Sequence, residues 1–142
     1  MTLAFFSMDT IYEKEMVNEF ETLSSIKKFN LQINGFDTFK NGSMVLILDI
    51  SRSESIVQIH RNAQELWSTK LKEKASKLTI SKTPHMTIST MNDKDILEAS
   101  FKKFDAVGYQ RNFEVDQLVL TSRLPFKTWD WEHRIRLNST SE

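Results

Sequence analysis

Residues 83–90 read Thr83-Pro84-His85-Met86-Thr87-Ile88-Ser89-Thr90, and the rest of the chain is organised around this stretch. Successive side chains of a strand point to opposite faces, so an extended conformation places His85, Thr87 and Ser89 on one face. An imidazole moves a proton near neutral pH, and a threonine hydroxyl donates a hydrogen bond to a phosphate oxygen. The stretch therefore predicts a strand with one polar face suited to a phosphate group.

A single His-x-Thr motif is weak evidence for a phosphate site. The sequence contains three histidines and twelve threonines, so chance alone places such a motif in roughly one sequence in four of this composition. The alternative is a plain α+β interaction domain in which His85 is structural. Other features of the sequence distinguish a phosphate site at His85 from a structural histidine.

The composition is that of an ordinary globular protein. The chain has 142 residues, 39% of them hydrophobic and 27% charged, with a formal net charge of zero, which fits one domain with its own core. The absence of cysteine excludes disulfides, zinc-cysteine sites and thiol nucleophiles. No apolar run reaches the roughly 20 residues of a membrane span. We expect a cytoplasmic protein.

Positive charge is concentrated ahead of the central stretch. Five lysines fall there: Lys70, Lys72, Lys74, Lys77 and Lys82. These lysines belong either to a solvated helix end and loop or to a source of positive potential near His85.

Hydrophobic spacing predicts alternating strands and helices. Expected helices span residues 9–26, 54–75 and 92–105, the last capped by Asn92 or Asp93. Expected strands span residues 1–6, 29–35, 44–50, 113–120 and 129–137. The Asn41-Gly42 pair favours a tight turn, so the second and third strands are expected to form a hairpin.

The two other histidines have different expected roles. His60 falls on a helix with no second metal ligand three or four residues away, and is interpreted as a surface or boundary residue. His133 alternates with the tryptophans of the last strand, which favours a packed or hydrogen-bonded histidine over a catalytic one.

The two halves of the chain repeat the same plan. Met1-Thr2-Leu3 matches Met86-Thr87-Ile88 at an offset of 85 residues, and Phe29-Asn30-Leu31 matches Phe113-Glu114-Val115 at an offset of 84. Each half is a strand, a helix and a strand, which predicts two similar lobes. In this register the counterpart of His85 falls one position before Met1.

These features together resemble the two-histidine (2H) phosphoesterases, which include 2'-5' RNA ligase-like proteins and cyclic phosphodiesterases. Their signature is a pair of His-x-Thr-hydrophobic motifs, one in each pseudo-symmetric lobe. His85-Met86-Thr87-Ile88 is similar to the second motif, and Thr2-Leu3-Ala4-Phe5-Phe6 is similar to the first motif without its histidine.

The resemblance implies an α+β fold of two pseudo-symmetric lobes, each a small antiparallel sheet backed by helices, facing across a central cleft. Residues 1–142 would form one such domain, lacking the family's N-terminal strand and helix. The missing first histidine is read as a trimmed or misplaced start, with a naturally reduced member as the alternative.

The resemblance also implies a metal-independent phosphodiesterase that needs no cofactor. Its substrates would be RNA-type phosphodiesters, either 2',3'-cyclic phosphate ends or 2',5'-linked oligoadenylates, so the partner is RNA, an oligonucleotide or a cyclic nucleotide. His85 and Thr87 would be catalytic, and Thr2 and Thr87 would bind the substrate. The alternative is an impaired module that binds nucleotides or RNA ends without cleaving them.

Overall fold

The computed structural model describes residues 1–39, 44–125, 127–128 and 130–139. It contains helices and antiparallel sheets, so the predicted α+β class is confirmed. The turn expected at residues 40–43 and the Trp129 end of the last expected strand lie outside the described residues.

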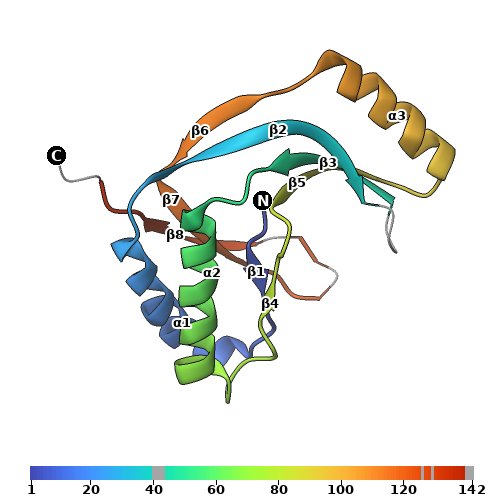
Figure 1. The fold of residues 1–142 in the computed structure, drawn as a ribbon. Coiled ribbons are helices and arrows are strands. Elements are labelled where there is room, and N and C mark those ends of the chain that lie inside the picture. Colours follow the sequence, from blue (N-terminus) through green and yellow to red (C-terminus); the bar gives the residue numbers. More distant parts are fainter. Residues whose placement is uncertain (40–43, 126, 129, 140–142) are drawn as a thin grey trace. The chain divides into compact units, whose positions relative to one another are not determined.

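The chain divides into two compact units that interleave along the sequence (Figure 1). The first unit consists of Met1–Leu3, Asn30–Ser53 and Ser81–Phe113. The second consists of Ala4–Phe29, Glu54–Ile80 and the chain from Glu114 onwards. The order strand, helix, strand that the repeat predicts is present in both halves of the chain. The expectation that each half forms its own lobe is wrong, because each unit combines segments of both halves.

A four-stranded sheet forms most of the first unit. Its strand order is β5 (His85–Met91), β3 (Met44–Ile50), β2 (Phe29–Phe39) and β6 (Arg111–Val115). The predicted hairpin is confirmed, because β2 and β3 pair antiparallel. The central strand β3 is apolar on both faces, and its residues Leu46 and Ile47 are fully buried. A strand with neighbours on both sides and cover on both faces reads as such a continuous apolar run.

Strand β2 continues past Gly35, where the sequence suggested that it ended. Gly35 has a φ of 114°, and the pairing with β3 shifts between Ile33 and Gly35. Glycine adopts this positive φ at little cost, so the strand accommodates a bulge here and bends without ending. Figure 1 shows β2 as a long, curved strand.

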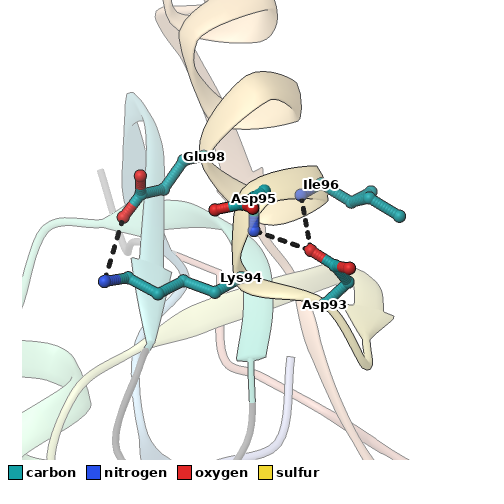
Figure 2. A network of polar contacts seen from close by, with 5 residues as sticks. All are labelled: Asp93, Lys94, Asp95, Ile96 and Glu98. Carbon is teal, nitrogen blue, oxygen red and sulfur yellow. Dashed lines mark hydrogen bonds and ion pairs between the residues drawn. The ribbon is translucent and has the colours of Figure 1, made fainter.

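Helix α3 (Lys94–Val107) packs on this sheet through a few side chains. Asp93 caps it, as predicted, and accepts hydrogen bonds from the backbone amides of Asp95 and Ile96 (Figure 2). The Phe104 ring lies 5.2 Å from the ring of Phe36 on β2. Gly108 ends the helix with a φ of 68°, as its position after the last helical turn predicts.

The second unit begins with a helical segment that is less regular than expected. Residues 9–26 form a 3₁₀ turn, η1 (Thr10–Tyr12), the helix α1 (Glu13–Phe20) and a second 3₁₀ turn, η2 (Glu21–Ser25). The prediction of one continuous helix is therefore wrong. Near its end, the Thr22 hydroxyl donates to the Glu19 carbonyl at 2.6 Å, and such side-chain bonds compete with the regular helical pattern.

Helix α2 (Glu54–Leu66) also ends before the predicted residue 75, and a π-helical turn (Trp67–Leu71) follows it. The hydroxyls of Ser68 and Thr69 both donate to the Glu65 carbonyl, at 3.0 and 2.7 Å. They satisfy an acceptor that a regular helix would use for a backbone amide, which favours the change of winding.

Two small antiparallel pairs complete the second unit. Strand β1 (Ala4–Phe5) pairs with β4 (Thr79–Ile80), and β7 (Gln117–Ser122) pairs with β8 (Trp131–Arg136). The strand expected at 113–120 is divided at Asp116, whose carbonyl accepts a hydrogen bond from the Leu137 amide at 2.8 Å. The strand expected at 1–6 is reduced to two residues.

Candidate active site

The loop before β5 places His85 through backbone bonds. Pro84 is buried, and its carbonyl accepts a hydrogen bond from the Ile50 amide at 3.3 Å. A proline fixes its own φ and holds the preceding residue, here Thr83, in an extended conformation. The Ser81 hydroxyl also donates to the Thr83 carbonyl, at 3.2 Å. The direction of that carbonyl is therefore set before the strand begins.

The Thr83 carbonyl determines which nitrogen of His85 is available. The His85 Nδ1 atom lies 2.7 Å from the Thr83 oxygen. A carbonyl oxygen only accepts hydrogen bonds, so Nδ1 must carry the proton and donate. Neutral imidazole has one protonated nitrogen, so the other nitrogen, Nε2, keeps its lone pair. The neutral His85 ring is thus held in the tautomer whose lone pair lies on Nε2.

An aromatic side chain fixes the plane of the same ring. The ring of Phe39, on β2, meets the His85 ring edge to face, with centroids 4.8 Å apart and an angle of 89° between the planes. Such T-shaped pairs are favourable beyond the area that they bury. The Thr83 carbonyl and Phe39 together restrict both the rotation and the tilt of the imidazole. The side chains of His85 and Phe39 are half-buried.

Thr87 shares the His85 face, but Ser89 does not. His85 and Thr87 pair with Asp49 and Ile47 of β3, and a register shift then brings Ser89 opposite Leu46. Because adjacent residues of a strand face opposite sides and cross-strand partners share a side, Ser89 lies on the face of Leu46. The prediction of three polar residues on one face is therefore wrong for Ser89, since the bulge at Ile88 reverses the alternation.

The spacing of His85 and Thr87 suits a phosphate group. Residues two apart on a strand are separated by roughly 6.6 Å, which leaves room for one tetrahedral anion with a hydrogen bond of about 2.8 Å on each side. The Thr87 side chain is exposed. The arrangement therefore combines an imidazole nitrogen that carries a lone pair and a hydroxyl donor on one strand face.

A polar group that the sequence did not reveal lies beside His85. Asp49 is the cross-strand partner of His85, and its Oδ2 atom accepts a hydrogen bond from the Asn34 amide nitrogen at 3.1 Å. The same nitrogen donates to the Ser51 hydroxyl at 2.9 Å. Asn34 sits in the β2 bulge. Gly35, which ended the expected strand, marks this bulge instead, because a glycine in a strand often accompanies one.

Thr2 lies in the same unit as His85. The carbonyl of its neighbour Leu3 accepts a hydrogen bond from the Ser81 amide at 2.9 Å, so the N-terminal segment runs beside the loop that leads to His85. The Thr2 side chain is exposed. Its predicted role in substrate binding remains a prediction.

The other two histidines belong to the second unit. His133 forms a hydrogen bond with the Glu21 carboxylate through Nε2 and stacks on Trp131 at a centroid distance of 6.2 Å, as expected for a packed, hydrogen-bonded residue. His60 is buried within α2, with an exposed fraction of 7%. Its interpretation as a surface or boundary residue is wrong, because the buried helix face is wide enough to include the position after Ile59.

The lysines ahead of His85 are divided between the two units. Lys82 lies in the unit of His85, whereas the other four lie in the second unit. Lys74 forms an ion pair with Glu15 and lies over the Tyr12 ring, so its charge is already compensated within that unit.

Among the described residues, no group of three or more His, Asp or Glu side chains is arranged to hold a metal ion.

Comparison with known families gives the family of the chain. A family model described as the 2'-5' RNA ligase superfamily matches residues 1–125, a span that includes Thr2, His85 and Thr87. The chain belongs to the 2'-5' RNA ligase superfamily. Membership in this 2H phosphoesterase superfamily indicates a phosphoesterase or ligase-like function and an RNA-related substrate. A comparison with curated proteins gave no match.

In the part of the chain that the structure describes, no helix has the length and apolar character needed to span a membrane.

Proposed function

We propose that this 2'-5' RNA ligase superfamily member is a phosphodiesterase that cleaves RNA-type phosphodiesters, either 2',3'-cyclic phosphate ends or 2',5'-linked oligoadenylates. The observation that carries the proposal is the hydrogen bond from His85 Nδ1 to the Thr83 carbonyl. It leaves Nε2 as the atom that takes or gives a proton, on the strand face that also carries Thr87.

Each residue has one chemical task in this proposal. His85 transfers a proton to or from an oxygen of the reacting phosphodiester, which is general acid-base catalysis. Thr87 donates a hydrogen bond to a non-bridging phosphate oxygen, where negative charge accumulates in the transition state. Thr2 supplies a second hydroxyl of the same kind. These steps are proton transfers and hydrogen bonds, so the proposed reaction proceeds in the presence of a metal chelator.

A second candidate function is the binding of a nucleotide or an RNA end without cleavage. The two-histidine scheme uses a second proton-transferring histidine, and the sequence holds only two besides His85. His60 is buried in α2, and His133 is engaged by Glu21 and Trp131. These placements favour a site that binds phosphate through Thr87 and His85 but turns over slowly.

Hydrolysis and binding assays on a small set of variants test both candidates. The substrates are a 2',5'-linked oligoadenylate and a 2',3'-cyclic nucleotide, each with a chelator present. Thr87→Val removes the hydroxyl at nearly constant shape and should reduce kcat/KM roughly 10- to 100-fold, because hydrogen bonds to charged groups are strong. Thr38→Val is the matched control: Thr38 pairs with Leu46 and so lies on the sheet face opposite His85 and Thr87, and the same change there should leave the rate unchanged.

The outcomes separate the two candidates. Turnover that depends on Thr87 but not on Thr38 supports the phosphodiesterase. Binding without turnover, weakened by Thr87→Val, supports the binding module. If the chain neither binds nor cleaves either substrate, both candidates are wrong and His85 has a structural role.

A further inference from the structure

We infer that Asp49 binds a ribose hydroxyl next to the scissile phosphate, so that the site takes 2',5'-linked substrates in preference to 2',3'-cyclic phosphates. This inference rests on the proposed function and names its substrate class. It arises from the Asn34, Asp49 and Ser51 group beside His85, which the proposed reaction does not otherwise use.

The sheet register puts the Asp49 carboxylate beside the reacting group. Asp49 and His85 are direct cross-strand partners, and the Cβ atoms of such partners are about 4.5–5.5 Å apart. Their side chains project from the same face. A ligand whose phosphate lies between His85 and Thr87 therefore brings its neighbouring atoms next to Asp49.

The neighbouring residues hold this carboxylate in place. The Asn34 amide nitrogen donates to Asp49 Oδ2 at 3.1 Å and to the Ser51 hydroxyl at 2.9 Å, and the Ser51 hydroxyl donates back to Asn34 Oδ1 at 3.2 Å. Asp49 is half-buried. A carboxylate fixed in this way needs little reordering when a ligand binds, which favours affinity.

The chemistry of a carboxylate determines what it recognises. It only accepts hydrogen bonds and repels the phosphate itself, so its partner must be a hydroxyl or amino group close to the phosphate. In a 2',5'-linked oligoadenylate, the ribose that carries the 2'-phosphoester has a free 3'-hydroxyl on the adjacent carbon. In a 2',3'-cyclic phosphate both oxygens are bonded to phosphorus, and no such donor exists. Asp49 therefore fits the first class.

Equilibrium binding tests the inference directly. The two ligands are adenylyl-(2',5')-adenosine and the analogue that lacks only the 3'-hydroxyl of the phosphorylated ribose. Binding is measured by calorimetry in the His85→Gln background, so that neither ligand is cleaved. With Asp49 present, the hydroxyl ligand should bind roughly 10- to 100-fold more tightly than the deoxy ligand, because a hydrogen bond to a charged acceptor is lost in the latter.

Substituting Asp49 should abolish this preference. In Asp49→Ala the ratio should fall to within about threefold of one, while the deoxy ligand still binds, which shows that the variant is folded. Asp105→Ala removes an exposed carboxylate from α3 of the same unit and should keep the full ratio. Asn34→Ala should lower the ratio partly, since Asp49 loses its support.

The two possible failures are distinguishable. A ratio near one with Asp49 present, or a preference that persists in Asp49→Ala, overturns the role of Asp49 and leaves the proposed function standing if binding still depends on Thr87. If neither dinucleotide binds with or without Asp49, the inference and the proposed function fail together.

Discussion

Replacing Asp93 by alanine should destabilise the first unit measurably, because this side chain supplies the N-cap of α3. Asp93 Oδ1 accepts from the Asp95 amide at 2.8 Å and from the Ile96 amide at 3.1 Å (Figure 2). Backbone amides in the first turn have no partner within the helix. Alanine would leave both amides without this acceptor.

The size of the effect follows from what else holds α3. Loss of an N-cap side chain costs about 0.5–2 kcal/mol of unfolding free energy. Two amides lose their acceptor, and Leu97 is the only buried residue that the described helix contributes, so we expect a loss in the upper half of this range, about 1–2 kcal/mol. The exposed Lys94–Glu98 pair, 3.8 Å apart, contributes only about 0.2–0.5 kcal/mol.

Urea denaturation followed by circular dichroism measures these differences. Asp93→Asn keeps a capping oxygen and should cost less than about 0.5 kcal/mol, because asparagine is nearly as good an N-cap. Lys94→Ala removes only the ion pair and should cost about as little. The reasoning is refuted if Asp93→Ala matches the wild type, or if Asp93→Asn is as costly as Asp93→Ala.

Two further substitutions probe the core and the site. Leu97→Ala should cost about 2–5 kcal/mol in the same denaturation assay, because Leu97 is fully buried and its loss leaves a cavity; a cost below 1 kcal/mol would contradict the packing. Phe39→Leu should lower kcat of phosphodiester hydrolysis by roughly 2- to 10-fold with a smaller change in KM, because the edge-to-face pair with His85 is worth about 0.5–1.5 kcal/mol. An unchanged kcat would show that Phe39 does not orient the imidazole.

Much of the fold could be predicted from local patterns. The hairpin of β2 and β3, the cap at Asp93 and the helix end at Gly108 were predicted from alternation, capping and glycine. The helices predicted at 9–26 and 54–75 were each expected to be one continuous α-helix. Hydrophobic spacing carries no information about hydroxyl groups, such as that of Thr22, that donate hydrogen bonds to nearby carbonyls and interrupt the regular winding.

The site was only half predictable. The motif identified His85 and Thr87, which do share a face. The Thr83 carbonyl is a local support, whereas Phe39 and Asp49 reach His85 through strand curvature and sheet register. Neither strand curvature nor sheet register is encoded within a short stretch. A register shift of one residue exchanges the two faces of a strand, which is also why the placement of Ser89 was wrong.

The rate of hydrolysis of a 2',5'-linked oligoadenylate, with a chelator present, tests the central claim most directly when wild type and His85→Ala are compared. We expect the variant to lose roughly 10²- to 10⁴-fold in kcat, the usual contribution of one positioned proton-transfer group. Both proteins should unfold at similar urea concentrations, since the His85 side chain is only half-buried. Cleavage by a folded His85→Ala variant at the wild-type rate would contradict the claim that His85 transfers a proton in this reaction.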